Sequence, residues 1–325
     1  MGEFGLIDLL GKIAPQGGPE HRMLIGIGDD AAAWQGDDAM VLATTDAMAE
    51  GVHFTAGTPC WELGWKALAV NLSDIAAMGG IPGYALVNLS LPGETEVEDV
   101  TQLYRGMAEL AKQHRVAIVG GNITSAPIVM IAVTVIGKGV RDGLLRRAAA
   151  VPGDRIAVTG HLGAAAAGLK VVTGDLKLAP ETVAALKKAY LQPQPRIAQG
   201  QALVRHGVRA AIDISDGLVA DLGHVCAASK VGATVRVNAV PIHPSVREAL
   251  GNDALRLALT GGEDYELLFT ASEQTVREVE ASLGADCPVT VIGEVTDGTS
   301  VVLLGEDGKP YHIDGLGWDH FRKGG

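Results

Sequence analysis

A chain of 325 residues is long enough for two domains with separate cores. With 47% apolar residues, 20% charged residues and 43 glycines, its composition is typical of a compact α/β protein and excludes a fibrous or largely disordered chain. The formal net charge of −12 argues against nucleic acid or an anionic membrane surface as a partner, because both require clustered Lys and Arg.

The cysteines and the apolar runs indicate the compartment. Cys60, Cys226 and Cys287 are isolated and form no CxxC pair, so the sequence predicts neither a disulfide framework nor a structural zinc site. No apolar run approaches the roughly 20 residues that span a bilayer, and the chain does not begin with a charged segment followed by an apolar one. We therefore expect a cytoplasmic protein.

Strands and helices alternate along the first half. Short runs rich in β-branched residues and bounded by Gly, Pro or Asp predict strands at 23–28, 40–45, 84–91, 116–120 and 128–137. The segment CWELGWKALAVNLSDIAAMGG carries apolar residues at three- and four-residue steps and ends in two glycines, which predicts a helix. A second helix is predicted over EVEDVTQLYRGMAELAKQHR, which is acidic at its start and basic at its end.

A small-residue stretch and a Pro-Gly-Asp turn in AAAVPGDRIAVTG predict a domain border near residue 150. The second half repeats the α/β rhythm. Its strands are expected near 155–159, 210–214, 233–237, 266–270, 290–295 and 300–304. Its helices are expected near 163–173, 180–189, 195–206, 217–229 and 273–283.

Carboxylates follow apolar runs at several points of the chain. They are Asp29 and Asp30 in MLIGIGDDAAAW, Asp46 in VLATTD, Asp213 and Asp216 in AAIDISD, and Glu263 and Asp264 in LTGGEDYE. Converging carboxylates repel one another and lose hydration, which raises their pKa values and costs stability. A bound cation among them would remove this cost.

Asp74 supports the cation interpretation. It lies in the last turns of an apolar helix, where the helix dipole disfavours an anion, and Asn71 precedes it by one turn on the same face. Oxygen ligands without clustered His or Cys favour Mg²⁺, which binds through a few carboxylates and the phosphates of a substrate. Two alternatives stay open: Asp74 as a solvated helix residue, and Asp216 as the N-cap of the following helix.

Several phosphate-binding classes are excluded or weakened. The chain contains no GxxxxGK[ST] and neither of the protein-kinase signatures HRD and DFG. Residues 26–31 formally match the dinucleotide pattern GxGxxA, but two carboxylates inside that turn would repel a pyrophosphate. The turn in TGHLGAAAAGL, with Gly160 and Gly163, could bind a phosphate at a helix N-terminus or simply be a tight strand-to-helix connection.

Eight segments together cover essentially the whole chain: GIGDDAA, TTDAMAEGVHF, KALAVNLSDIAAMGG, GGNITSA, VPGDRIAVTGHLGAAAAGL, AIDISDGLVADLGH, LTGGEDYELLF and GLGWDHF. They resemble the thiamine-monophosphate kinase family, whose fold is similar to that of aminoimidazole-ribonucleotide synthetase. The resemblance implies an α/β protein with an α+β domain at 1–150, which binds ATP and magnesium and whose sheet pairs across a homodimer. It also implies a three-layer α/β domain at 151–325 that completes the active site.

The activity implied by the resemblance is direct transfer of the ATP γ-phosphoryl group to thiamine monophosphate, which gives thiamine diphosphate and ADP in thiamine diphosphate biosynthesis. A phosphate acceptor is already ionised, so no general base, and hence no catalytic side chain of that kind, is expected. The expected work is to hold two anions in line and to neutralise the charge between them with several Mg²⁺ ions.

Site residues follow from the resemblance position by position. The magnesium ligands implied are Asp30, Thr44, Thr45, Asp46, Asp74, Asn122, Asp213 and Asp216. The nucleotide contacts implied are Tyr104, Gly121, Asn122, Arg147 and Ser215, with Arg146 as a competitor of Arg147. The thiamine contacts implied are His53, Glu263 and Trp318.

Three of these positions, and Asp29 beside them, need a separate comment. Asn122 stands where the family commonly has Asp, so one metal is expected to be held more weakly or through water. Trp318 offers an aromatic face to a cationic thiazolium ring, or packs on its own domain. His53 is either a substrate contact or a structural histidine, and Asp29 is a cap or a water-mediated partner next to the ligand Asp30.

Two other functions remain as alternatives. One is another ATP-dependent synthetase or dehydratase of the same superfamily; against it, Lys12 has no nearby Cys and the chain ends in DHFRKGG without a cysteine. The other is a non-catalytic sensor of magnesium and nucleotide. A sensor would not need the substrate positions His53, Glu263 and Trp318.

Overall fold

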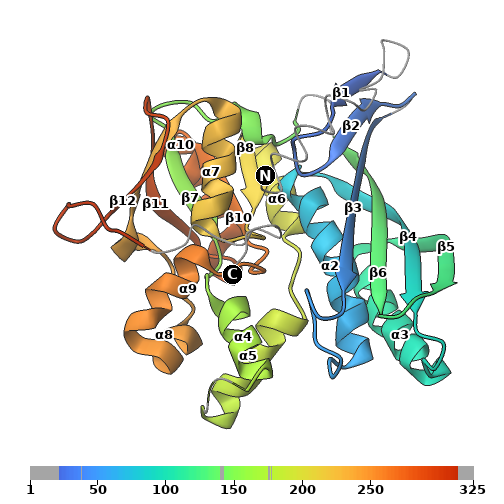
Figure 1. Ribbon diagram of the computed structural model, residues 1–325. Coiled ribbons are helices and arrows are strands. Elements are labelled where there is room, and N and C mark those ends of the chain that lie inside the picture. Colours follow the sequence, from blue (N-terminus) through green and yellow to red (C-terminus); the bar gives the residue numbers. More distant parts are fainter. Residues whose placement is uncertain (1–21, 38, 140–142, 175, 177, 314–325) are drawn as a thin grey trace.

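The computed structural model describes residues 22–37, 39–139, 143–174, 176 and 178–313 and contains two mixed six-stranded sheets (Figure 1). The first sheet has the order β1-β2-β3-β6-β4-β5, and every neighbouring pair is antiparallel except β4 and β5. Its strands are β1 Met23–Ile25, β2 Ala32–Gln35, β3 Met40–Ala49, β4 Ile81–Leu91, β5 Ala117–Ser125 and β6 Met130–Gly139.

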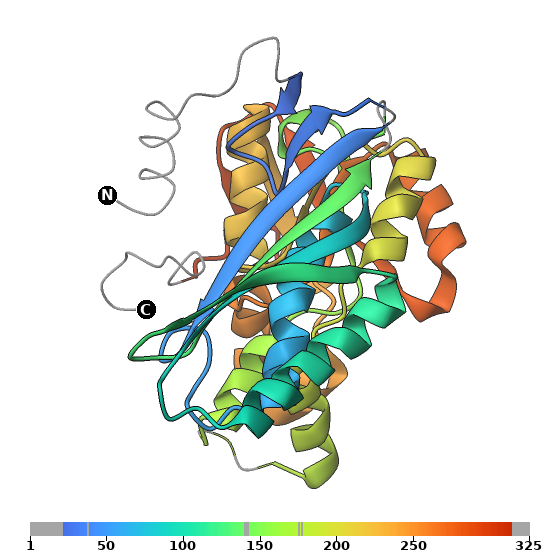
Figure 2. The same ribbon diagram turned by 90° about the vertical axis from the view of Figure 1, so that its right-hand side faces the viewer.

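Two helices cover one face of the first sheet. They are α2 (Cys60–Ala77) and α3 (Val97–His114), and α3 makes the crossover between the parallel strands β4 and β5. Residues of β4 and β6 alternate between buried and more exposed, as expected for strands with one covered face. Figure 2 shows the long strands of this sheet side by side.

The second sheet has the order β12-β9-β11-β7-β10-β8, with only β12 and β9 parallel. Its strands are β7 Arg155–Thr159, β8 Ala210–Asp213, β9 Gly232–Arg236, β10 Leu267–Ala271, β11 Val289–Thr296 and β12 Val301–Leu304. The helices of this half are α4 Ala164–Val172, α5 Pro180–Leu191, α6 Ile197–Arg205, α7 Leu218–Ser229, α8 Pro244–Leu250, α9 Ala254–Thr260 and α10 Glu273–Leu283.

Helices pack on both faces of the second sheet, which confirms the expected three layers. Ala157 and Phe269 share a buried cluster with residues of α6 and α10. Ile156 and Leu268, their neighbours along the strands, join a second cluster with residues of α7 and α9. The first cluster continues through α2 into the first sheet, so the two halves share a core.

Most predicted elements are confirmed, and the fold class is as expected. The misses are β2, where an alanine-rich run gives a weak strand pattern, and the one-turn to two-turn helices α8 and α9. The strand expected at 23–28 ends at Ile25, and Gly28, three residues later, has a φ of 123° in the turn that follows. Among the described residues, no helix combines the length and hydrophobicity needed to cross a membrane.

Candidate active site

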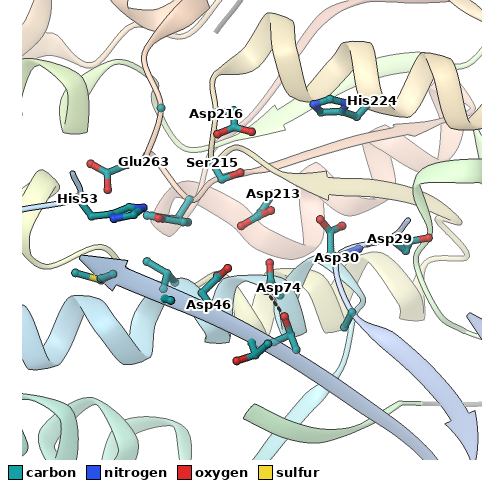
Figure 3. Close-up of a pocket in the computed structure, with 18 of the residues that line it drawn as sticks. Asp29, Asp30, Asp46, His53, Asp74, Asp213, Ser215, Asp216, His224 and Glu263 are labelled. Atoms are coloured by element: carbon teal, nitrogen blue, oxygen red, sulfur yellow. Dashed lines mark hydrogen bonds between the residues drawn. The ribbon is translucent and has the colours of Figure 1, made fainter. Parts of the chain in front are cut away.

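A cavity of about 1050 Å³ is lined by residues of both halves. The first half contributes the turn after β1, strand β3 and the end of α2, and the second half contributes the segments that follow β8 and precede β10. Figure 3 shows the acidic side chains at the centre of this cavity, with His53 and Glu263 at one end and Asp29 at the other.

Three carboxylates converge at the centre. Asp30 precedes β2, Asp74 lies in the last turn of α2, and Asp213 ends β8. Each offers an oxygen atom, and these atoms lie within 4.8 Å of one another. Asp46, on β3, lies beside them (Figure 3). Segments more than 180 residues apart in sequence thus bring together the acids that the sequence pattern singled out.

Neighbouring polar side chains orient these carboxylates. The Thr44 hydroxyl donates to Asp74 Oδ2, and Ser73 Oγ donates to Asp213 Oδ2 at 2.6 Å. Asn71 Oδ1 accepts from the backbone N–H of Asp46 at 2.9 Å. Residues two apart on a strand share a face, so Thr44 and Asp46 both face α2. Asn71 and Asp74, which the sequence places on one face of α2, therefore both contact β3: Asn71 through the backbone of Asp46, and Asp74 through the hydroxyl of Thr44.

Thr45 alternates to the opposite face of β3. Its hydroxyl donates to the carbonyl oxygen of Val133 at 3.1 Å and accepts from Thr134 at 3.0 Å. The residue still lines the cavity, but its hydroxyl is engaged within the sheet.

Burial and mutual repulsion raise the pKa values of the central carboxyl groups. Loss of hydration, followed by the nearby charge of Asp30, raises the pKa of Asp213 to about 7. Burial and the charges of Asp46 and Asp213 raise the pKa of Asp74 well above its ordinary value. Asp74 also lines the cavity and accepts from Thr44, so the interpretation of Asp74 as a solvated helix residue is wrong.

Arg147 supplies positive charge next to this cluster. Its Nε donates to Asp30 Oδ1 at 3.1 Å, and its backbone N–H lies 3.3 Å from both carboxylate oxygens of Asp29. Asp29 also accepts from the N–H of Asp30 at 3.1 Å, which is the contact of a cap. Arg146, the competitor, is exposed and lies outside the cavity lining.

The donor set fits a hard cation. Asp30 Oδ2 is buried and has no hydrogen-bond partner among the described residues. A buried carboxylate oxygen without a donor is costly, and oxygen-only surroundings are those that Mg²⁺ prefers. The central cluster therefore fits the metal that the sequence predicts.

A second acidic group lies where α7 begins. Asp221 Oδ2 accepts from the backbone N–H groups of Ser215, Asp216 and Gly217 at 3.0–3.1 Å. The N-cap of α7 is Gly217, with a φ of 120°, so the alternative that made Asp216 the N-cap is wrong. Asp216 and Ser215 line the cavity instead.

Asp221 and His224 were missed by sequence reasoning. Both lie on α7 near Asp216, and each of the three offers one ligand atom within 4.8 Å of the others. Burial lowers the pKa of His224 to about 4, with Arg147 as the second cause. The sequence did contain a signal for Asp221. It is an acid at the start of the helix that follows Ser-Asp-Gly, and a helix start leaves unpaired N–H groups that an acid can accept from.

The other end of the cavity contains His53 and Glu263. His53 Nδ1 accepts from the N–H of Ala49 at 3.0 Å, which holds the imidazole against the end of β3. Glu263 and Tyr265 have φ values of 68° and 49°, rare for residues other than glycine. The turn is held by Glu263 N–H donating to the carbonyl of Ser215 at 2.8 Å. Left-handed φ values at such residues cost conformational free energy, which the surrounding structure offsets to hold these side chains in place.

The turn at Gly163 is a structural connection. Asp264 accepts from the N–H groups of Gly163 and Ala165 at 2.6 and 3.1 Å, so a carboxylate of this chain already occupies the N-terminus of α4. Of the two interpretations of that segment, the tight strand-to-helix turn is the one that the hydrogen bonds support.

Three predicted nucleotide contacts lie away from the cavity. Gly121 and Asn122 are on the edge strand β5, and Tyr104 on α3 lines a separate open cavity of about 580 Å³ that also contains Ile123. None of these three residues lines the acidic cavity of its own chain. Trp318 lies outside the described residues.

Comparisons with known proteins give two family matches and relatives of nearly full length. The AIR synthase related protein, N-terminal domain family matches residues 28–138, and the AIR synthase related protein, C-terminal domain family matches residues 151–305. The thiamine-monophosphate kinase of Escherichia coli (strain K12) is 39% identical over 301 residues, which are 91% of this chain and 92% of that protein. The thiamine-monophosphate kinase of Bacillus subtilis (strain 168) is 35% identical over 331 residues, 99% of this chain and 100% of that protein.

A solved structure is similar over nearly the full length. AaThiL complexed with AMPPCP and TMP superposes with a TM-score of 0.86 at 34% sequence identity, covering 98% of this chain and 97% of that chain. Both the arrangement of the two sheets and the sequence are thus shared with proteins of one family.

Proposed function

The chain belongs to the thiamine-monophosphate kinase family, and from this membership we propose that it transfers the γ-phosphoryl group of ATP directly to thiamine monophosphate, giving thiamine diphosphate and ADP. It is an ATP-dependent phosphotransferase. The observation that carries the proposal is the cavity between the two halves, with converging carboxylates at its centre and His53 and Glu263 at one end.

Mg²⁺ is the cofactor we propose for the central cluster. Asp30, Asp46, Asp74 and Asp213 would hold it, supported by Thr44 and Ser73 through their hydrogen bonds. Bound there, it would supply the positive charge that phosphoryl transfer requires between two anionic substrates.

The side chains of this chain do the work of binding and orientation. The Arg147 guanidinium lies beside the cluster and can pair with phosphate oxygens. His53 and Glu263 line the end of the cavity that we assign to the thiamine moiety. The acceptor phosphate is already ionised at neutral pH, so none of these residues is required to remove a proton.

We also propose that two copies form a homodimer through the uncovered face of the first sheet. Tyr84, Leu86 and Met130, on β4 and β6, are between 37% and 52% exposed, which is unusual for large apolar side chains on adjacent strands. Pairing of this face with a second copy would bury them. A cytoplasmic location, expected from the isolated cysteines, stays a prediction.

The function is tested by incubating the purified chain with MgATP and thiamine monophosphate and measuring thiamine diphosphate and ADP. We expect the two products in equal amounts. If neither product forms, and free thiamine is also unreactive, the proposal fails. ADP without thiamine diphosphate would instead indicate an ATPase or another synthetase of the superfamily, and nucleotide binding without turnover would indicate a sensor.

A substitution at the centre of the cluster tests the role of the carboxylates. Asp46→Asn removes a charge but keeps the size of the side chain, so we expect turnover to fall more than about 100-fold while the fold is retained. Circular dichroism and denaturation establish the fold. The matched control is Asp297→Asn in the exposed turn between β11 and β12, which should keep full turnover. Wild-type turnover of Asp46→Asn would exclude Asp46 from the site.

A further inference from the structure

Lys66 is a buried cation that the motifs did not single out. It lies on α2 within a run of buried residues, and only 3% of its side chain is exposed. Its Nζ atom is 2.7 Å from Glu263 Oε1 and 3.7 Å from the centre of the Tyr190 ring. The ammonium and the carboxylate form a close ion pair. Three segments, from both halves of the chain, therefore meet at one charge.

Burying this charge is expensive. An ammonium removed from water costs several kcal/mol, and a buried ion pair often stabilises a fold no better than apolar residues of the same volume. A gain in stability is therefore a weak explanation for this buried salt bridge. What it does provide is a defined position for its partners, because the charge holds the carboxylate on one side and the electron-rich ring face on the other.

Both partners of Lys66 are walls of the cavity. Glu263 is 27% exposed at its side chain and lines the cavity in its left-handed backbone conformation. Tyr190 also lines the cavity, and its hydroxyl donates to the carbonyl oxygen of His53 at 3.0 Å. Lys66 itself does not line the cavity, so it acts through these neighbours.

We propose that Lys66 is a positioning residue for the organic part of the acceptor substrate: it fixes the Glu263 carboxylate and the Tyr190 ring at the end of the cavity that receives the thiamine moiety. The proposal rests on the function proposed above. Because Oε1 of Glu263 is engaged by Lys66, the carboxylate is presented in one orientation, and its charge is partly neutralised. The shape of the thiamine end of the cavity then selects the substrate, rather than a general attraction between the Glu263 carboxylate and cations.

Lys66→Met tests the proposal, since methionine fills a similar volume without the charge. We expect KM for thiamine monophosphate to rise about tenfold or more, while KM for ATP stays within about twofold, because the ATP phosphates are expected at the carboxylate cluster. Equilibrium dialysis of thiamine monophosphate should show the same weakening without any turnover. Equal changes in both KM values, or no change in either, would overturn the proposal.

Two further variants keep the test decisive. Removing only the ammonium leaves the Glu263 carboxylate without its partner, which can itself unfold the chain. The double variant Lys66→Met/Glu263→Gln leaves no unpaired charge, and its loss of affinity for thiamine monophosphate should be smaller than the sum of the two single losses, because part of the effect of Lys66 acts through Glu263. Additive losses in the double variant would contradict this route.

The matched control is the ion pair between Arg196 and Glu266, in which the Glu266 side chain is only 5% exposed and neither residue lines the cavity. Arg196→Met should lower stability without separating the two KM values. Failure of the proposed function is distinguished by the wild-type chain: if it neither binds thiamine monophosphate nor turns it over, the function fails. If it does both and Lys66→Met is unchanged, only the role of Lys66 fails.

Discussion

At the scale of single residues, the carboxylates of the acidic cavity lower the stability of the fold when no cation is bound. Asp30, Asp74 and Asp213 are held close together by hydrogen bonds and by the chain on either side, and Arg147 is the cation that contacts Asp30. The cost is expressed in the raised pKa values of these carboxyl groups. Residues that favour binding of a cation in this way reduce the stability of the metal-free fold.

This leads to a pH dependence of the metal-free protein. The pKa of Asp213 is raised from 3.8 to about 7, so the folded state holds a proton there that the unfolded state has lost between these values. Stability therefore falls as pH rises through this window and stays low above it. Asp213→Asn cannot lose this proton, so we expect it to gain roughly 2–4 kcal/mol relative to wild type between pH 5 and pH 8.

The measurement is urea denaturation of both chains in the presence of a chelator at each pH. Titrating histidines are common to both chains and cancel in the difference. Added Mg²⁺ should reverse the order at pH 8, because it stabilises only the chain that retains its carboxylate. A constant difference between the two chains from pH 5 to pH 8 would show that the pKa of Asp213 is not raised into this window.

At the scale of elements, α2 is the helix that places most of the site. It carries Lys66, Asn71 and Asp74, and it packs against strands of both sheets and against α3. Its contact with α3 is close: a Cβ atom built on Gly106 would lie 1.8 Å from the carbonyl oxygen of Trp61, and one on Gly64 would lie 1.8 Å from that of Leu103. Each helix therefore needs a glycine where it meets the backbone of the other.

Gly106→Ala should consequently destabilise the fold, although alanine is the better helix former. The new methyl group meets backbone that cannot rotate away, so we expect a loss of about 1–3 kcal/mol or more and reduced turnover as α2 shifts. The control is Gly223→Ala on α7, where the added Cβ would meet no atom within 4 Å other than those of its own stretch of helix. That variant should be neutral or more stable by up to about 1 kcal/mol. Denaturation midpoints compare the two, and equal stability would refute close packing at Gly106.

At the scale of the whole molecule, the cavity exists only because the two halves are fixed together. The hydrogen bond from Ser73 to Asp213 and the ion pair of Lys66 with Glu263 both join α2 to the second half. Asn122, in contrast, lies three strands away from β3 along the row Asn122, Asn88, Ala132 and Ala47, about 14 Å across the sheet. It shares a face with Ala47, opposite to that of Asp46.

The nucleotide contact proposed for Asn122 therefore requires a second copy of the chain. We expect Asn122→Ala and Asp46→Asn to be inactive separately, and a refolded equal mixture to regain about a quarter of wild-type turnover, since half of the dimers then contain one intact site. Sedimentation measures the dimer, and the product assay measures recovery. No recovery in a mixture shown to contain mixed dimers would place Asn122 outside the partner's site, and full activity of Asn122→Ala alone would exclude it from any site.

The sequence by itself determined the elements and the chemistry. Apolar periodicity and turn residues are local properties, so the strands and long helices were predictable. The acids at the ends of apolar runs indicated a hard cation from the sequence alone. Short elements without a clear period, such as β2 and α8, were not predictable in this way.

Only the tertiary structure decided which groups meet. Asp221 satisfies the start of α7 in place of Asp216, Arg147 rather than Arg146 reaches the cluster, and Lys66 supports Glu263 from across the core. These pairings depend on the packing of segments far apart in sequence, and the positions of Asn122 and Tyr104 depend on strand order. Neither the packing of distant segments nor the strand order leaves a periodic or local pattern in the sequence, because contact between distant residues is a property of the folded molecule.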